Sequence, residues 1–255
     1  MAYFWKQQDD IPAELGYPLF GTEHILSTTL TLVIVALFAI LFKRLNDKKQ
    51  RAVLKAIPVF MVLLETFKDL FLVKVGRFSL GYLPLHVCSM GIFVLFLREY
   101  LPWDKAKKAL GEIAFVLIMP GSLAALIFPN WTELYPVFNF MNLYSFVWHG
   151  LLVLYPILIL MRREIEPSVK HIHYPIIFLC IVVPPIYAFD KHFGYNYFFV
   201  NRPEKGTPLE WMASFMGNPG YLVGYAILAI SIMLFIYLII HVTGVFTGIT
   251  RDRVK

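Results

Sequence analysis

Long apolar runs constrain the fold of this chain more than any other feature of its sequence. Runs of roughly twenty such residues are long enough to cross a bilayer as α-helices. Of the 255 residues, 58% are hydrophobic and 16% are charged, a balance far from that of ordinary soluble domains. The runs are also much longer than the roughly ten alternating residues of a barrel strand. The sequence therefore predicts an all-α, polytopic membrane bundle.

About seven transmembrane helices are expected, in one transmembrane domain comprising residues 1–255. The runs lie near residues 25–42, 56–73, 80–97, 109–128, 139–161, 174–189 and 221–245. Glu65, Lys68 and Asp69 interrupt the second run, and Pro184 and Pro185 are expected to bend the sixth. No internal repeat is apparent, and an odd number of spans does not fit the inverted halves of many transporters.

The distribution of arginine and lysine predicts the orientation. The loops after the first, third and fifth runs, together with the end of the chain, hold sixteen basic residues, against six on the opposite side. By the positive-inside rule the amino terminus lies outside and the carboxyl terminus in the cytosol. The same distribution explains the net charge of +6 without nucleic acid, because the basic residues form no continuous stripe.

The start of the chain, its cysteines and its overall pattern add three expectations. Residues 1–23 contain Asp9, Asp10 and Glu14 and no basic region or cleavage motif, so the first run is expected to remain in the mature protein. Cys88 and Cys180 lie within apolar runs, so no disulfide is expected. The pattern is typical of a bacterial cytoplasmic membrane protein.

The longest outer loop, residues 190–219, is rich in aromatic and turn residues. One interpretation is a lid that lies on the membrane surface. The other is an interfacial belt of tyrosine and tryptophan, which forms at membrane surfaces whatever the protein does. The sequence favours neither.

Four polar residues within the apolar runs are the candidate site: Glu65, His86, Cys88 and His149. An ionisable group at mid-membrane costs roughly 2.5 to 3.5 kcal/mol even on lenient scales, so each one is a functional hypothesis by default. Counting the helical rise from the span ends places all four within roughly 9 to 15 Å of the outer boundary. We therefore expect three helices to bring polar groups to one layer of the outer half of the bilayer.

Structural explanations compete with this hypothesis. Glu65, Lys68 and Asp69 share a helix face and can neutralise one another. On a helix, His86 and Cys88 would point about 200° apart, and a lone cysteine is more often a small buried apolar residue than a nucleophile. Asn142, Ser145 and His149 follow i, i+3, i+7 spacing, which interhelical hydrogen bonding explains as well as catalysis does.

The remaining histidines carry weaker signals. His171 and His173 alone are too few for a metal site, and neither a metal nor another cofactor is expected.

Three motifs give the chain a resemblance to a known family. They are residues 83–89 (LPLHVCS), Ser145-Phe146 with His149-Gly150, and Asn196-Tyr197 through Asn201-Arg202-Pro203. Together with Glu65 they resemble the bacterial YwaF-like integral membrane family, from the second span to the outer loop. That family is similar to a eukaryotic transmembrane transacylase, which moves a fatty acyl group from a diacyl phospholipid to an ether lysophospholipid through a cysteine thioester.

The resemblance implies lipid acyl transfer, with one departure. The eukaryotic cysteine immediately precedes the matching histidine, whereas Leu85 occupies that place here and Cys88 lies three residues further on. The leading hypothesis is a phospholipid acyltransferase of the outer leaflet. In it His149 or His86 is the general base, Cys88 the acyl acceptor, and Glu65 the residue that orients an imidazole.

The remaining candidate residues are assigned to substrate binding. Asn142 and Ser145 would donate hydrogen bonds to an oxyanion, and Lys68 and Arg77 would bind an anion or phosphate. The resemblance adds Asn196 and Arg202. A non-catalytic transporter, lipid-binding or solute-binding protein or partner subunit is the alternative, and a polar layer that only holds the bundle together is the third. The sequence does not predict the oligomeric state.

Overall fold

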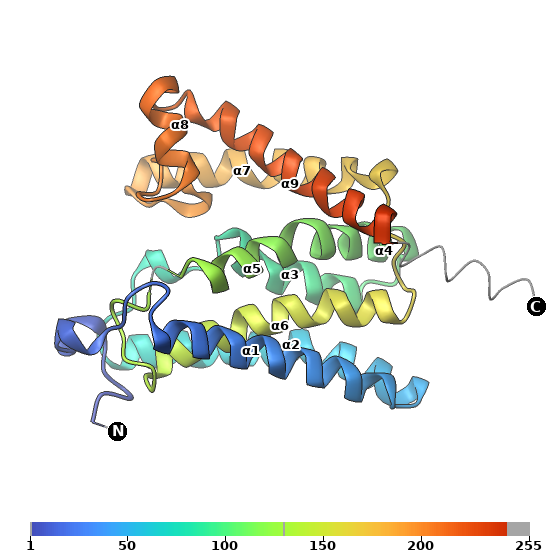
Figure 1. The fold of residues 1–255 in the computed structure, drawn as a ribbon, viewed down its shortest axis with the longest axis horizontal. Helices are drawn as coiled ribbons and strands as arrows, with labels where there is room; N and C mark the ends of the chain where they lie inside the picture. The colour runs from blue at the N-terminus through green and yellow to red at the C-terminus, as the bar shows by residue number, and fades with distance from the viewer. Residues whose placement is uncertain (1, 130, 244–255) are drawn as a thin grey trace, which may run out of the picture.

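The computed structural model describes residues 2–129 and 131–243, and every regular element in these ranges is helical (Figure 1). The α-helices are α1 Thr22–Lys43, α2 Asp47–Lys74, α3 Val87–Tyr100, α4 Asp104–Ile113, α5 Met119–Ile127, α6 Phe140–Met161, α7 His173–Phe193, α8 Pro208–Met216 and α9 Tyr221–Thr243. A π-helical segment, Ala114–Ile118, joins α4 to α5 without a break.

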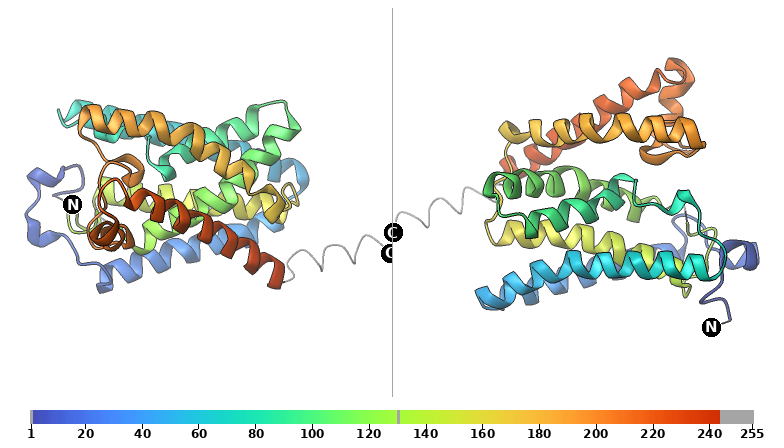
Figure 2. Two further views of the ribbon diagram at one scale, coloured as in Figure 1. Left: turned by 90° about the horizontal axis from the view of Figure 1, so that it is seen from above. Right: turned by 180° about the vertical axis from the view of Figure 1, so that it is seen from behind.

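The long helices run side by side in alternating directions, with α6 at the centre (Figures 1 and 2). α6 contacts α1, α2, α3 and α5. Of its apolar stretch 61% is buried, against 17% for α1 and α9. The helices α7, α8 and α9 form a further layer. Contacts between α7 and α4 join this layer to the rest of the bundle.

The alternation sorts the connections into two ends. The amino-terminal end comprises residues 2–21, 75–86, 128–129, 131–139 and 194–220, and the basic end comprises residues 44–46, 101–103 and 162–172 (Figure 1). The described basic residues that the sequence assigns to the cytosol therefore gather at or near a single end.

Five helical segments are long and apolar enough to cross a membrane: α1, residues 104–127, α6, residues 169–193 and α9. Large apolar side chains such as Leu26, Ile181 and Phe235 are exposed on α1, α7 and α9, as expected where lipid replaces water as the solvent. The protein is therefore a multi-pass membrane protein. The other two predicted spans differ in kind, because α2 carries charges along its length and α3 has only 14 residues.

The third predicted span, residues 80–97, is only partly a regular helix. A 3-10 turn comprises Leu80–Tyr82, residues 83–86 are not helical, and α3 begins at Val87. Pro84 explains the interruption, because it lacks an N–H donor and disfavours helical geometry in the residue before it. His86 is consequently the N-cap of α3, and the expectation that its direction follows from helical spacing to Cys88 was wrong.

Smaller differences concern other boundaries. Residues 190–193 of the predicted outer loop continue α7, and the loop contains the short helices Tyr197–Phe199 and α8. The fourth span is π-helical over residues 114–118, just before Pro120, whose ring excludes the ordinary hydrogen bond to the preceding turn. The predicted end of the last span, residues 244–245, lies outside the described residues.

A network of buried charges ties the basic end together. The side chain of Arg98 on α3 is only 4% exposed, and its guanidinium donates hydrogen bonds to Glu99 at 2.5 Å, the Tyr155 hydroxyl at 2.9 Å and Glu164 at 2.8 Å. Arg162 donates to Glu164 at 2.6 Å. The network thereby joins α3, α6 and the connection that follows α6.

We expect Arg98→Ala to destabilise the protein strongly. Removing one partner of a buried ion pair costs about 3 to 5 kcal/mol, because the opposite charge remains buried without its partner. Here that charge is the Glu99 carboxylate, whereas Glu164 keeps Arg162. Thermal unfolding of the purified protein in detergent measures the loss. Arg44→Ala, an exposed arginine near the same end, is the matched control and should leave the unfolding temperature unchanged. Equal unfolding temperatures for the two variants would contradict the role of Arg98.

The same network predicts a dependence of stability on pH. Burial alone would raise the pKa of Glu164, but hydrogen bonds from Arg162 and Arg98 outweigh it and hold the pKa below its ordinary value of 4.5. A depressed folded-state pKa stabilises the protein fully above pH 4.5, and this stabilisation is lost as the pH falls through the folded-state pKa. Glu164→Gln should therefore lower the unfolding temperature most near neutral pH, and the difference should shrink in acid. Glu166→Gln, at an exposed glutamate, should show no such trend.

Candidate functional site

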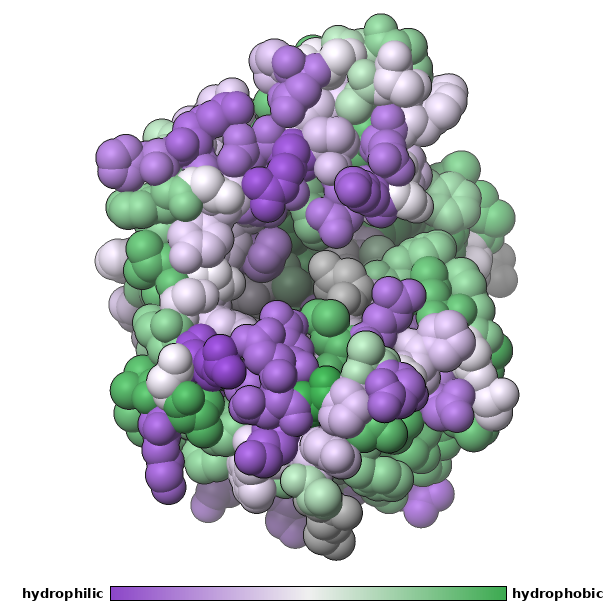
Figure 3. Space-filling view, turned by 90° about the vertical axis from the view of Figure 1, so that its left-hand side faces the viewer, coloured by the Kyte–Doolittle hydropathy of each residue, from purple (hydrophilic) through white to green (hydrophobic). Residues whose placement is uncertain are grey.

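Hydrophilic side chains surround a central hollow at the amino-terminal end of the bundle (Figure 3). Three helices place the predicted site residues toward this end. α2 contributes Glu65, 7% exposed, and α6 contributes His149, 6% exposed. α3 contributes His86 at its N-cap and Cys88 in its first turn, and both are half-buried.

A buried ion pair on α2 forms one part of the site. The Nζ atom of Lys68 lies 2.7 Å from a carboxylate oxygen of Glu65, and the pair is almost fully enclosed, with side-chain exposures of 6% and 9%. The Tyr144 hydroxyl donates a hydrogen bond to the other carboxylate oxygen of Glu65. Lys68 also donates to the Tyr82 carbonyl at 3.1 Å and approaches Asp69 at 3.3 Å. The spacing of Glu65 and Lys68 along α2 creates the pair, and α6 completes it through Tyr144.

Hydrogen bonding fixes the tautomer of His149. Its Nδ1 atom lies 2.7 Å from the backbone oxygen of Ser145, and a carbonyl oxygen can only accept a hydrogen bond. Nδ1 therefore carries the proton in the neutral ring, which leaves the lone pair on Nε2. The imidazole stacks on the indole of Trp131, with ring centroids 5.3 Å apart and an interplanar angle of 3°. The orientation of a potential base is thus set from two sides.

Aromatic rings of the loop between α7 and α8 flank His86. The Tyr197 ring meets it edge-on with centroids 4.8 Å apart, and the Phe199 ring lies at 5.8 Å. The Tyr197 hydroxyl donates to the Leu80 carbonyl, which joins the loop to the segment that precedes α3. The structure records no hydrogen bond of the His86 ring to any described residue.

The hydrogen bonds of Glu65 do not reach an imidazole. They go to Tyr144 and Lys68, and the group that orients the His149 ring is the Ser145 carbonyl. Glu65 therefore does not hold an imidazole in this conformation.

Several predicted binding residues are already engaged. Asn142 accepts from the Tyr17 hydroxyl at 2.8 Å and donates to the Val137 carbonyl at 2.9 Å. Lys68 is paired with Glu65, so neither Asn142 nor Lys68 is free for a ligand in this conformation. The Ser145 hydroxyl lies 3.4 Å from Nδ1 of His149 and stays a candidate for oxyanion binding.

The other three predicted binding residues lie further out at the amino-terminal end. The Asn196 side chain accepts from the backbone N–H groups of Asn201 and Arg202, at 3.2 and 3.0 Å, and so shapes the loop. The Arg202 guanidinium is exposed, with one contact to the Gly194 carbonyl at 3.4 Å. Arg77 pairs with Asp9 at 2.9 Å.

Sequence reasoning missed three residues that the structure places at or near the site. Tyr144 and Trp131 resembled the interfacial aromatic residues common to membrane proteins. Asp190, at the end of α7, is fully buried, and neither of its carboxylate oxygens has a described hydrogen-bond partner. The available signal was the position of Asp190 in the last turn of α7, just before Gly194, the glycine at which the helix ends. Within the described residues no three histidine, cysteine, aspartate or glutamate side chains form a group that could hold a metal ion.

The Glu65–Lys68 pair predicts non-additive mutational effects. Glu65→Gln removes the nearer of the two carboxylates beside the buried Lys68 ammonium and leaves Asp69 at 3.3 Å. Lys68→Met leaves the Glu65 carboxylate buried without its counter-charge, so each variant should lower the unfolding temperature clearly. The double variant should lose less than the two single losses together, with a coupling on the order of 1 to 3 kcal/mol. Thermal unfolding of the wild type, the two single variants and the double variant in detergent completes this double-mutant cycle. Additive losses would show that the two charges do not stabilise each other.

Comparison with known proteins agrees with the helical membrane architecture. No curated protein and no solved structure matches the chain significantly. The model of the TMEM164 family matches residues 19–237, which include α1 to α8, all four residues of the candidate site and most of α9. The chain therefore belongs to the TMEM164 family.

Proposed function

We propose that this protein is a membrane-embedded enzyme that transfers an acyl group between phospholipids in the leaflet at its amino-terminal end. The observation that carries the proposal is the geometry of His149. Its Nδ1 proton is held by Ser145, its ring is fixed by Trp131, and its Nε2 atom has no described hydrogen-bond partner. Such an imidazole is poised to accept a proton. The motifs around His86 and His149, which resemble the YwaF-like family, support the same chemistry.

In the proposed reaction the lone pair of Nε2 on His149 accepts the thiol proton of Cys88 as the sulfur attacks the ester carbonyl carbon of a donor phospholipid. The carbon–oxygen bond breaks, the imidazolium returns the proton to the lysophospholipid oxygen, and Cys88 holds the acyl group as a thioester. The hydroxyl of an acceptor lysophospholipid then attacks the thioester, and its proton passes through the imidazole to the sulfur. His86 is the other candidate base.

The membrane arrangement belongs to the proposal. We infer seven spans, because α2 and α3 pack among the five apolar helices and α2 neutralises its own charge inside the bundle. The basic residues at the opposite end support an extracytoplasmic amino-terminal end. This orientation would place the site in the outer leaflet of the bacterial cytoplasmic membrane. The proposed chemistry requires a thiol, an imidazole and lipid, and no cofactor.

A second candidate function is the non-catalytic binding of a lipid or small solute. The observation that favours it is the internal pairing of Glu65, Lys68 and Asn142, because a polar layer that satisfies its own groups does not need a reaction to explain it. Ligand-dependent thermal stabilisation without product would favour this function, whereas a covalent acyl adduct on Cys88 found by mass spectrometry would favour the enzyme.

The decisive experiment is acyl exchange between defined phospholipids by the purified protein in liposomes. We expect His149→Ala to slow exchange at least about 100-fold, the lower end for the loss of a general base. Cys88→Ala should abolish the acyl adduct, and His86→Ala tests the other candidate base. Cys180→Ala and His192→Ala change exposed residues of α7 and should keep wild-type rates. A silent wild-type protein, or full activity in all three site variants, would refute the enzyme.

A further inference from the structure

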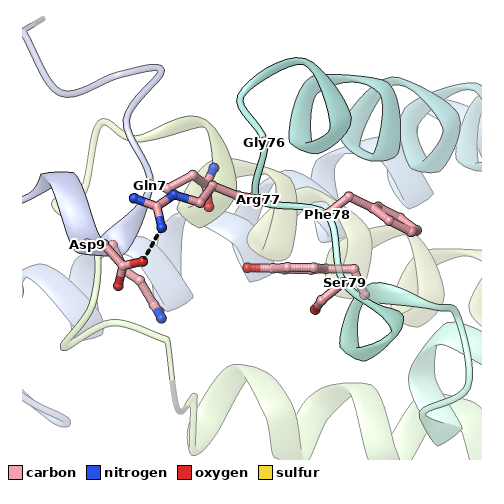
Figure 4. Close-up of a pocket in the computed structure, with 8 residues that line it drawn as sticks. Gln7, Asp9, Gly76, Arg77, Phe78 and Ser79 are labelled. Atoms are coloured by element: carbon pink, nitrogen blue, oxygen red, sulfur yellow. Dashed lines mark ion pairs between the residues drawn. The ribbon is translucent and has the colours of Figure 1, made fainter.

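A pocket lies at the amino-terminal end, between the N-terminal segment and the connection from α2 to α3 (Figure 4). Its volume of about 330 Å³ falls within the range of small-ligand sites. Gln7 and Asp9 line it from the N-terminal segment, and Arg77, Ser79 and Tyr82 line it from the connection. Gln7 and Asp9 precede residues 19–237, the part of the chain that matches the family.

Gln7 presents an unused hydrogen-bond donor in this pocket. The side chain is only 3% exposed, and its Oε1 atom accepts a hydrogen bond from the Tyr135 hydroxyl at 3.2 Å. The Nε2 atom is buried with no described hydrogen-bond partner. A buried donor without a partner costs free energy, so a ligand that supplies an acceptor there would be stabilised.

Arg77 is paired only weakly. Its guanidinium lies 2.9 Å from Asp9 and 3.7 Å from Asp10, but all three side chains are between 43% and 56% exposed. Exposed ion pairs contribute little, about 0 to 1 kcal/mol, so an incoming anion can open this one at small cost. A guanidinium also has five N–H donors in a planar fork that matches the oxygens of a phosphate.

The charges of the pocket restrict what can bind. An anion alone would gain Arg77 but would lie beside the two carboxylates, and a cation alone would lie beside Arg77. A ligand with both charges would complement all of these groups. We propose that this pocket binds a phosphate group that carries a cationic amine. Arg77 and the Nε2 atom of Gln7 donate to the phosphate oxygens, and Asp9, the carboxylate that lines the pocket, accepts from the amine.

The position of the pocket connects it to the candidate site. Tyr82, which lines the pocket, accepts a hydrogen bond from Lys68 through its carbonyl, and Lys68 is bound to Glu65. A zwitterionic phospholipid headgroup at this end carries the required phosphate and amine. In this lipid form the inference rests on the proposed function and names the headgroup class of the substrate. The binding itself does not depend on turnover.

Isothermal titration of the purified full-length protein tests the inference, with phosphoethanolamine, inorganic phosphate and ethanolamine as separate probes. We expect phosphoethanolamine to bind most tightly. Arg77→Gln should weaken its binding tenfold or more, and Arg77→Lys should weaken it less. Asp9→Asn should remove the preference for phosphoethanolamine over inorganic phosphate. Arg44→Gln, an exposed arginine near the basic end, should bind like the wild type, and thermal unfolding verifies that each variant is folded.

Two further comparisons are needed. One distinguishes a lipid from a free compound as the ligand, and the other distinguishes failure of this inference from failure of the enzyme hypothesis. Tighter binding of lysophosphatidylethanolamine than of phosphoethanolamine assigns the pocket to lipid, and equal binding assigns it to the free compound. A wild-type protein that binds phosphoethanolamine but catalyses no acyl exchange would refute the enzyme alone and leave this inference standing. Wild-type binding by folded Arg77→Gln, or no preference for phosphoethanolamine in the wild type, would overturn the inference.

Discussion

The buried ion pair between Glu65 and Lys68 is the interaction on which the centre of this bundle depends. Without mutual neutralisation, charges on α2 could not lie among packed helices in a membrane. The pair also joins parts of the chain, because Glu65 accepts from Tyr144 on α6 and Lys68 donates to the carbonyl of Tyr82 before α3. One interaction thus links α2 to α6 and to the irregular segment that precedes α3.

Hydropathy predicted most helices well, because the length of a span is set by the thickness of the bilayer. It did not predict where α3 begins. Pro84 interrupts the helix. Contacts within the protein, such as the hydrogen bond from Tyr197 to Leu80, offset the cost of the irregular backbone. Composition does not reveal such contacts. The orientation of His86 was lost with that boundary, since it had been inferred from helical spacing.

The candidate site was likewise predicted only in part from the sequence. Counting residues from the span ends predicted that Glu65, His86, Cys88 and His149 lie in one layer, because depth follows from helical rise. For His86 and Cys88 the count passed through residues 83–86, which are not helical. Which groups touch depends on how each helix is rotated about its axis, and this is set by packing along the whole interface. Tyr144 was therefore missed as the partner of Glu65. The contact of His149 with the Ser145 carbonyl lies within α6, at i and i+4, and the spacing along that helix had already placed the two residues on one face.

The two ends of the bundle differ in how fully their buried polar groups are paired. At the basic end, Arg98 and Glu164 bind each other within one network, in which the Nε atom of Arg98 is the buried polar atom without a described hydrogen-bond partner. At the amino-terminal end, Gln7, Trp131 and Asp190 each keep buried polar atoms without a described hydrogen-bond partner. Unsatisfied groups of this kind are costly, and stability alone gives no reason to retain them. A ligand that pairs with some of them is a physical reason for their presence, and it would enter where His149 already presents a free lone pair.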